Sequence, residues 1–440
     1  MKWFVESVAC DVDPLALFAA SRQPERFFWS QGGHAIASSG ALHVLSFRGA
    51  ERFEAAARAL AELLPSIETR DAGANGTPLP LLVGGFAFAA DPSSDPSWSG
   101  FDSLHFVLPG LMLCQRDGTG FLRGVEPAVP HASETAARAA LRQRLLRERE
   151  HLARLGAVAH AGSVVRAYRI EADRSHAQYR SLVAQARDAV RAGAFSKLVV
   201  ARSVRVAGRE PIDEIALLGV LRRGFPSCTT FAVTRGDRTF LGASPERLVR
   251  VCGRHVSAAA VAGTAPRGRS PEEDERLARA LRESKKEQEE HATVVDALRA
   301  TLTPLCSALT APESPQLLRV EGIQHLETPV EGTLLDDTSL LDLAGRLHPT
   351  PAVAGSPRDA ALQWLAENEG LARGWYAGGV GWIDARGGGE LCAALRSGLV
   401  CGTDAHLYAG AGIVAASDPE AELVETRLKL RTLLMPLLEL

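Results

Sequence analysis

Long apolar runs, a signal-like N-terminus and an excess of one charge are all missing from this chain. No stretch approaches the roughly 20 apolar residues that a membrane helix needs, and Asp11, Asp13 and Pro14 interrupt the apolar N-terminal segment. The 49 basic residues nearly balance the 52 acidic ones, leaving a net charge of −3 at pH 7. Because nucleic acids and anionic membranes attract strongly basic proteins, we expect neither as a partner. We expect a cytoplasmic protein without a signal peptide.

Cysteines with paired or metal-ligand spacing are also missing. The seven cysteines are scattered and contain no C-x-x-C, which is typical of reduced thiols rather than of a disulfide framework. The motifs G-x-x-x-x-G-K-[ST], H-E-x-x-H and G-x-S-x-G do not occur, and no G-x-G-x-x-G opens a helix after a strand. These absences argue against a P-loop or dinucleotide-binding protein, a zinc protease, a serine hydrolase and a thioredoxin-like enzyme.

The chain does contain both helical and strand patterns. Helices are predicted over 52–64, 133–155, 175–193, 271–303, 357–370 and 418–434. Strands are predicted within 34–47 (as a hairpin), 79–89, 103–125, 195–203, 229–234, 238–243, 247–251, 255–262, 375–384, 389–400 and 405–414. Strands in hairpins with long helices outside them predict an α+β fold rather than regular βαβ units.

The domain organisation is predicted from a change of pattern near residue 165. The Ala- and Gly-rich stretch 156–163 is the best candidate for a linker. We therefore expect an N-terminal part, 1–165, and a C-terminal part, 166–440, that together form one structural unit.

One lysine stands inside an apolar run, AFSKLVVARS at 194–203. On a strand, Phe195, Lys197 and Val199 share one face, so the ammonium of Lys197 would be desolvated. Desolvation lowers the pKa of a lysine and frees its amine as a base. The alternative is an edge-strand lysine that discourages aggregation, and the local sequence by itself favours this alternative.

Two further charged side chains stand next to apolar segments. Glu246 in FLGASPERLVRV follows a break in a strand and becomes a candidate general acid if burial raises its pKa. The alternative is a surface glutamate paired with Arg247 or Arg250. Arg396 in ALRSG is harder to explain away, because an interior guanidinium requires a bidentate anion.

Paired carboxylates recur on two predicted helices. Glu287 and Glu290 share one side of the helix 271–303, and Glu422, Glu425 and Lys429 share one face of the C-terminal helix. Carboxylate oxygens are the ligands that Mg²⁺ prefers. A solvated charged face explains the first helix equally simply.

Two loop or strand features complete the candidates. Gly410 and Gly412 in YAGAGIV allow the backbone to approach a small ligand closely. His348 in LHPTPAVAG is either a ligand-binding residue or a core or loop histidine bonded to the backbone, and the second is the commoner case.

Taken together and in this order, the segments resemble the chorismate-utilising enzymes, a family of isochorismate, salicylate, anthranilate and aminodeoxychorismate synthases. The matching segments are FSKLVVAR, FLGASPERL, VAGTAPRG, KKEQEEH, LHPTPAVAG, WYAGGVGWID, ALRSG, YAGAGIV and ELVETRLK. The N-terminal VGGFAFAADP and LPGLMLCQ are similar to the menaquinone-type isochorismate synthases. The resemblance implies large antiparallel sheets packed face to face with helices on the outside.

The resemblance also implies a reaction. Lys197 would activate a water that attacks C2 of chorismate, and Glu246 would protonate the departing C4 hydroxyl, so that isochorismate forms. A lysine at this position is typical of the water-using members, whereas the anthranilate synthases, which add ammonia, resemble a different pattern with glutamine. A salicylate synthase, which goes on to eliminate pyruvate, and a non-catalytic regulatory relative are the alternatives.

A cofactor and a binding site follow from the same resemblance. Mg²⁺ would be held by Glu290 and Glu425, with Glu287 and Glu422 near enough to hold its waters. The implied substrate-binding residues are Thr264, His348, Tyr376, Arg396, Gly410, Gly412 and Lys429. Chorismate is the expected small-molecule partner, and the expected oligomeric state is a monomer or a weak homodimer.

Overall fold

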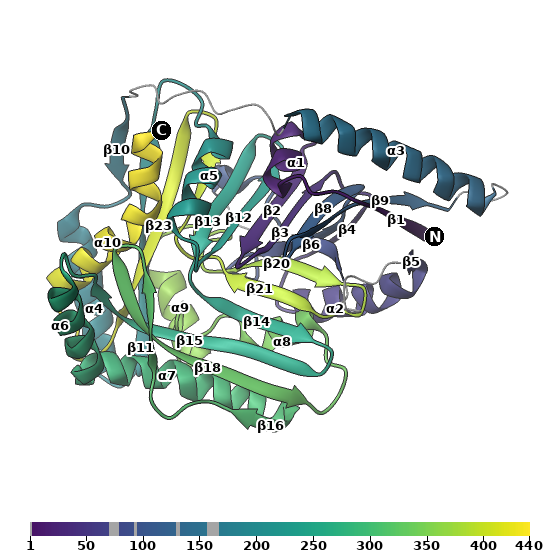
Figure 1. The fold of residues 1–440 in the computed structure, drawn as a ribbon. Helices are drawn as coiled ribbons and strands as arrows, with labels where there is room; N and C mark the ends of the chain where they lie inside the picture. The colour runs from purple at the N-terminus through teal and green to yellow at the C-terminus, as the bar shows by residue number, and fades with distance from the viewer. Residues whose placement is uncertain (1, 70–78, 92–94, 129–132, 156–166) are drawn as a thin grey trace.

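Two large β-sheets form the centre of the protein, and helices surround them (Figure 1). The computed structural model describes residues 2–69, 79–91, 95–128, 133–155 and 167–440. The linker expected at 156–163 lies outside these residues. Within the described residues, 13 strands belong to the first sheet and 10 to the second.

The strands of the first sheet come from both ends of the chain. In spatial order they are β10 (Arg169–Ala172), β11 (Lys197–Ala207), β23 (Asp404–Ile413), β22 (Ser397–Cys401), β13 (Arg238–Ser244), β12 (Thr229–Arg235), β2 (Glu25–Gln31), β3 (His34–Ser39), β8 (Leu111–Arg116), β9 (Thr119–Pro127), β1 (Trp3–Ala9) and β5 (Ile67–Thr69). A short strand, β19 (Gly355–Ser356), pairs with the start of β11.

The second sheet is assembled in the same way. Its order is β16 (Cys306–Thr310), β18 (Ile323–Leu334), β15 (His255–Pro266), β14 (Arg247–Cys252), β21 (Gly389–Ala393), β20 (Gly379–Asp384), β6 (Pro80–Phe86), β7 (Leu104–Leu108) and β4 (His43–Phe47), and β17 (Gln316–Val320) pairs with β18. The β1–β5 pair is parallel, and the long central pairs, such as β11–β23 and β15–β18, are antiparallel.

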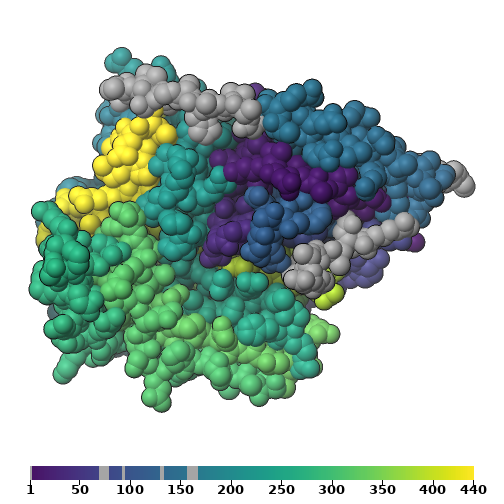
Figure 2. Space-filling view, in the orientation of Figure 1, coloured from purple at the N-terminus to yellow at the C-terminus, as the bar shows by residue number. Residues whose placement is uncertain are grey.

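Strands that precede residue 165 are hydrogen-bonded to strands that follow it in both sheets. Strand β2 pairs with β12 in the first sheet, and β6 pairs with β20 in the second. Figure 2 shows the purple N-terminal segments in direct contact with the teal segments from the middle of the chain. Each sheet is therefore continuous across the expected boundary.

The helices are amphipathic and bury one face against the sheets or against each other. They are α1 (Pro14–Ala20), α2 (Arg52–Leu63), α3 (Glu134–Leu155), α4 (His176–Arg191), α5 (Glu214–Gly224), α6 (Pro271–Glu283), α7 (Lys285–Leu302), α8 (Leu340–Leu347), α9 (Arg358–Asn368) and α10 (Pro419–Glu439). In the part of the chain that the structure describes, no helix is long and apolar enough to span a membrane.

The core between the two sheets is aromatic. Trp29 of β2 and Trp382 of β20 meet edge to face, with ring centroids 6.4 Å apart. Trp375 is fully buried and donates its indole N–H to the carbonyl of Asp102 at 2.8 Å, as a buried tryptophan requires. Because residues of both sheets share this core, the α+β class and the face-to-face packing are confirmed.

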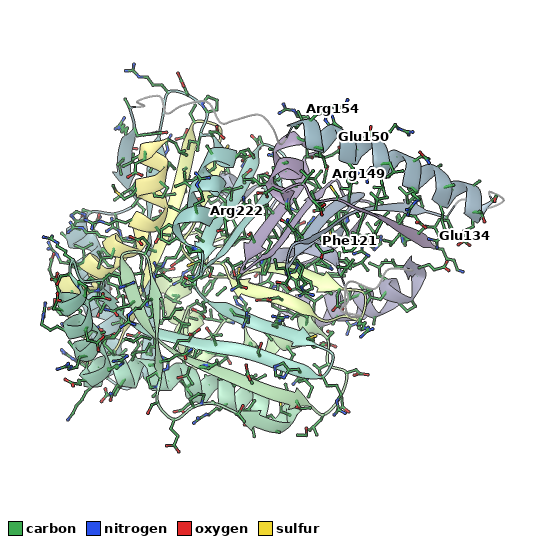
Figure 3. The ribbon with its side chains drawn as sticks, viewed as in Figure 1. Phe121, Glu134, Arg149, Glu150, Arg154 and Arg222 are labelled. Carbon is green, nitrogen blue, oxygen red and sulfur yellow. The ribbon has the colours of Figure 1, made fainter. Side chains whose placement is uncertain are left out.

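Charged side chains stabilise the outer helices. Figure 3 shows Glu134 and Arg154 at opposite ends of α3, in the first and last turns where their charges complement the helix dipole. Arg222 of α5 donates to the carboxylate of Asp13 at 2.8 Å, and Asp13 is itself the N-cap of α1.

One predicted helix is two helices. The pattern predicted a single helix over 271–303, but the chain turns at Ser284, whose φ of −69° and ψ of 113° are extended. The hydroxyl of Ser284 accepts a hydrogen bond from the amide of Glu287 and so caps α7. The break matters because it sets the direction of α7, which carries Glu287 and Glu290.

Two predicted strand segments divide between the sheets. The segment 34–47 is not a hairpin, because the chain turns at Gly40 (φ 75°) and sends β3 and β4 to different sheets. The segment 389–400 divides into β21 and β22 at Arg396, which has a φ of 49°. A non-glycine residue in this conformation is strained, and Arg396 lies at a proposed binding site.

Candidate active site

A cavity lies where β11, β15 and β23 face α7 and the loops after β13 and β21. Its lining includes Lys197, Glu246, Thr264, Glu290, Tyr376, Arg396, Gly410, Gly412 and Lys429. Nine of the residues singled out in the sequence are thus in one place, although they come from segments far apart in the chain. The cavity volume is about 60 Å³.

Lys197 opens β11 and is buried at this cavity. Its side chain is 1 % exposed, and its Nζ lies 3.0 Å from Oε1 of Glu290. Strand β11 pairs with β23 on one side and, at Lys197, with β19 on the other. Lys197 is therefore not on an edge strand, and the aggregation-guard interpretation is wrong. Burial by itself would raise the pKa of Glu290, but the charges of Lys197, Lys286 and Lys429 together outweigh it and hold that pKa below its ordinary value.

Glu246 lies between β13 and β14 and is 4 % exposed. The hydroxyl of Ser244 fixes the local turn, because it accepts from the amide of Glu246 at 3.3 Å and donates to the carbonyl of Ala393 at 2.5 Å. Burial raises the pKa of Glu246 to about 8, against the opposing charges of Lys197, Lys429 and Arg396. The surface-glutamate interpretation is therefore wrong, and the group is protonated at neutral pH.

The other acidic candidates lie behind the cavity, on α7 and α10. Lys286 bridges them, with its Nζ 2.7 Å from Glu422 and 3.2 Å from Glu287. Glu425 contacts Lys429 at 2.6 Å. Burial and the charge of Glu425 raise the pKa of Glu422 to about 7. These carboxylates repel one another, and lysine ammonium groups now offset part of their charge.

The donors in this region suit a hard divalent cation. Among the described residues, no three acidic, histidine or cysteine side chains converge tightly enough to form a complete metal site. However, α7 and α10 present carboxylate oxygens of the kind that Mg²⁺ takes. The ammonium groups of Lys197 and Lys286 already lie against two of these carboxylates, those of Glu290 and Glu422. The residues fit such an ion chemically.

A cationic wall faces these carboxylates. Arg396 is 7 % exposed, and its guanidinium donates to Nε2 of His325 at 2.7 Å and to Thr432 at 3.3 Å. Arg396 forms no ion pair within the described residues, so its charge is free to take an anion. Lys429 donates to the carbonyl of Gly410 at 2.9 Å, and Tyr376 lines the wall beside them.

His325 is the residue that sequence reasoning missed. It is 4 % exposed, lies opposite Thr264 across the β15–β18 pair, and contacts the carbonyl of Gly263 through Nδ1 at 3.1 Å. Burial and the charge of Arg396 hold its pKa well below the ordinary value. A neutral ring that donates from Nδ1 can accept from Arg396 at Nε2, so His325 orients the guanidinium. The one signal was a histidine inside an apolar strand pattern, IQHLET.

His348 is not in this cavity, and its proposed role at the ring pocket is wrong. Its Nε2 lies 3.1 Å from the carbonyl of Phe88, and its ring packs on Phe86 at 4.9 Å. Burial lowers its pKa to about 3. The plainer interpretation, a core histidine bonded to the backbone, is the correct one.

The two strand glycines leave room for the charged groups. A Cβ on Gly412 would stand 2.1 Å from Oε1 of Glu290 and 3.0 Å from Cε of Lys197. A Cβ on Gly410 would stand 3.1 Å from the hydroxyl of Tyr376. Glycine at 412 therefore permits the Lys197–Glu290 contact, as well as any close approach of a ligand.

A second buried ion pair, also missed, supports β11 from the opposite edge. Arg373 contacts both oxygens of Glu369, at 2.7 and 2.6 Å, and donates to the carbonyls of Val199 and Val353 at 2.8 Å each. Glu369 accepts from the amide of Ala201 at 2.7 Å. Between β19 and β10 no strand covers these β11 groups in the described chain, and the ion pair takes that place.

Comparison with known proteins agrees with this geometry. A family model described as "Chorismate binding enzyme" matches residues 3–438. The salicylate biosynthesis isochorismate synthase of Pseudomonas aeruginosa is 36% identical over 423 residues, covering 95% of this chain and 86% of the relative. Isochorismate synthase MenF of Bacillus subtilis is 33% identical over 358 residues, covering 81% and 74%.

A solved structure is similar over almost the whole length. The menaquinone-specific isochorismate synthase MenF from Escherichia coli superposes with a TM-score of 0.79 at 26% identity, covering 99% of this chain and 94% of that one. The putative 2,3-dihydroxybenzoate-specific isochorismate synthase DhbC from Bacillus anthracis gives a TM-score of 0.76 at 28% identity, covering 96% and 99%.

Proposed function

Because this chain belongs to the family of chorismate-binding enzymes, we propose that it is an isochorismate synthase, an isomerase that converts chorismate into isochorismate. The observation that carries the proposal is the meeting of Lys197 and Glu246 at one buried cavity. Water addition at one ring carbon with loss of a hydroxyl from another requires both a base and an acid.

Lys197 is the proposed base. Once its contact with Glu290 opens and its ammonium has released a proton to solvent, the neutral amine accepts a proton from the water that attacks C2. Ammonia needs no such base, so a buried lysine at this position favours water as the nucleophile. The ring double bonds then shift, and the bond between C4 and its hydroxyl breaks.

Glu246 is the proposed acid. The raised pKa of about 8 keeps its proton in place at neutral pH, and that proton goes to the departing C4 hydroxyl, which leaves as water. One water enters and one leaves, so the conversion is an isomerisation without redox change.

The remaining residues bind and orient the substrate's carboxylates. Arg396, held by His325, and Tyr376 take the enolpyruvyl carboxylate, with support from Lys429 and from the backbone at Gly410 and Gly412. Thr264 lines the ring pocket. These assignments are supported by the position of each side chain on the cavity wall.

Mg²⁺ is the proposed cofactor, held by Glu290 and Glu425, with Glu287 and Glu422 positioned to hold its waters. When bound, the ion neutralises these carboxylates and the ring carboxylate of the substrate. Glu290 then no longer depends on Lys197 for its counter-charge.

A salicylate synthase is the second candidate, because one relative carries salicylate biosynthesis in its name. A salicylate synthase forms isochorismate and then eliminates pyruvate from it. The base, the acid and the binding wall serve both reactions, so only the products separate the two.

The test is to incubate the purified protein with chorismate and Mg²⁺ and to resolve the products by chromatography. Isochorismate as the single new product, lost on addition of a chelator, supports the proposal. Salicylate together with pyruvate would assign the second candidate. No turnover at all would contradict the enzyme assignment and favour a non-catalytic relative.

A further inference from the structure

A second and larger cavity lies apart from the proposed active site. It has a volume of about 980 Å³ and is lined by the start of α2, residues 87–91 after β6, the chain after α8, and α9 with residues 369–374. It shares no lining residue with the cavity that holds Lys197. The Glu369–Arg373 pair separates the two, because Arg373 lines the second cavity and donates to carbonyls that line the first.

Two arginines of this second cavity lack a carboxylate partner. Arg52 and Arg358 are the first residues of α2 and α9, where the helix dipole disfavours a cation. Within the described residues, neither forms an ion pair. Among the residues that the structure describes, Arg358 donates only to the carbonyls of Arg346 and Leu347, at 2.6 and 3.3 Å. The positive charges of the two guanidiniums and of the two helix N-termini together favour binding of an anion.

Arg52 is the more deeply buried of the two arginines. It is 5 % exposed, and among the described residues its only hydrogen bonds are long ones, to the carbonyls of Gly49 at 3.4 Å and Ala87 at 3.5 Å. Its Nε is buried and finds no partner in the part of the chain that the structure describes. An unsatisfied guanidinium in the protein interior is unfavourable, and an anionic ligand would satisfy it.

Both guanidiniums lie near His348, which lines the same cavity. Arg52 lies over the Phe53 ring, whose centroid is 6.1 Å from that of the His348 ring. Arg358 donates to the carbonyl of Leu347, the residue before His348.

Asp91 acts on the charge of Arg52 and Asp359 on that of Arg358, and both carboxylates belong to exposed residues. A further carboxylate that lines the cavity, that of Glu369, is held by Arg373.

The rest of the wall is apolar and aromatic. Phe53 and Phe88 line the cavity together with Leu362 and Leu365, and the guanidinium of Arg52 lies over the Phe53 ring at 4.7 Å. An apolar wall with a few convergent charged groups is the usual make-up of a small-molecule site. The ligand that matches it has a flat apolar body and one anionic end.

We propose that this second cavity binds a small aromatic carboxylate, whose ring lies against Phe53 and Phe88 and whose carboxylate takes the guanidiniums of Arg52 and Arg358. The site is independent of the proposed reaction, since none of its residues lines the cavity of Lys197 and Glu246.

Binding of benzoate, measured by calorimetry on the full-length protein, tests the proposal. The Arg396→Gln variant disables the anion-binding wall of the first cavity. Benzoate that still binds to this variant must therefore occupy another site. In Arg52→Gln and in Arg358→Gln, we expect binding to weaken about 10- to 100-fold, the usual effect of losing a hydrogen bond to a charged group. Arg346→Gln, which removes a nearby charge that does not line the cavity, should leave binding unchanged.

Loss of binding must be separated from loss of folding. Since Arg52→Gln alters a buried residue, its thermal unfolding is compared with that of the wild type, and Arg358, which is only half-buried, provides the variant least dependent on folding. The proposal is overturned if wild-type protein binds no benzoate, or if binding disappears in Arg396→Gln alone. It is equally overturned if all arginine variants bind alike, or if benzyl alcohol binds as well as benzoate.

Discussion

Two buried ion pairs flank the strand β11, and they differ in how completely their charges are satisfied. Arg373 and Glu369 make two contacts with each other and further hydrogen bonds to three backbone groups. Lys197 and Glu290 make a single contact of 3.0 Å beside a cavity. The first pair is locked by its neighbours, whereas the second can be opened by a ligand.

The difference shows that burial of a charge does not by itself identify a functional residue. Arg373 is as deeply buried as Glu246, at 4 % exposed for each, but every donor of Arg373 that the structure pairs is committed to the fold. Lys197 and Glu246 keep groups that face open space. Ionisable groups that line a cavity, rather than burial as such, mark the candidate site.

The largest effect is expected from removal of the loosely held lysine. Lys197→Ala should reduce the turnover of chorismate about 100- to 10,000-fold, the usual contribution of a general base. The fold should persist, because Lys286 and Lys429 also stabilise the charge of Glu290. Initial rates by chromatography and a circular dichroism spectrum check both parts. Arg205→Ala, on the same strand with a half-exposed side chain, is the matched control, and a Lys197→Ala enzyme of normal turnover would return Lys197 to a structural role.

Breaking the locked pair should act on stability instead. Arg373→Met leaves Glu369 charged and buried, and the carbonyls of Val199 and Val353 without their donor. The free energy of unfolding should therefore fall by about 3–5 kcal/mol in a urea titration. The double variant Glu369→Leu with Arg373→Met removes the stranded charge and should recover part of the loss, but not all, because the amide of Ala201 loses its acceptor. An Arg373→Met protein as stable as the wild type would show that the pair does not support β11.

The pH dependence of turnover should be set by the ionisation of Glu246. Glu246 has a raised pKa of about 8 and acts as the protonated acid, so turnover should fall about tenfold per pH unit above that value, as expected for one ionisation. Glu246→Gln, which keeps the shape but cannot deliver the proton, should be slow and should lack this decline. A wild-type rate that rises steadily from pH 7 to about 10 would contradict the role of Glu246 as acid.

The smallest effect concerns strain next to the locked pair. Ala377 has a φ of 62°, a conformation that costs an L-residue about 1–2 kcal/mol and glycine little. Ala377→Gly should therefore raise the free energy of unfolding slightly, by about 0.5 kcal/mol, after the entropy lost by glycine is counted. Ala189→Gly, within the regular helix α4, should instead lower it by about 1 kcal/mol. Equal destabilisation by both changes would show that Ala377 is not strained.

Much of the site could be predicted because its residues lie in short segments with a recognisable order. Lys197, Glu246 and Arg396 were each ambiguous in their local sequence, and the resemblance as a whole brought them together. No spacing rule could have placed Lys197 of β11 against Glu290 of α7, since that contact depends on the packing of a sheet against a helix.

What could not be predicted depended on tertiary contacts. Glu369 and Arg373 are four residues apart and look like an ordinary surface pair, and only the uncovered edge of β11 makes them structural. His325 and His348 both stand in apolar surroundings, and which one meets Arg396 is decided by the β15–β18 register. The strand break at Arg396 required a strained backbone conformation that sequence patterns do not reveal.

The central claim, that Lys197 and Glu246 exchange one water for another on the chorismate ring, is tested most directly by turnover in heavy-oxygen water, with the product analysed by mass spectrometry. The account predicts an isochorismate that carries one heavy oxygen, located in the C2 hydroxyl, with none exchanged into recovered chorismate beyond reversal of the reaction. A product that retains only the oxygens of the substrate would mean that the hydroxyl migrates within the molecule, and it would contradict the account.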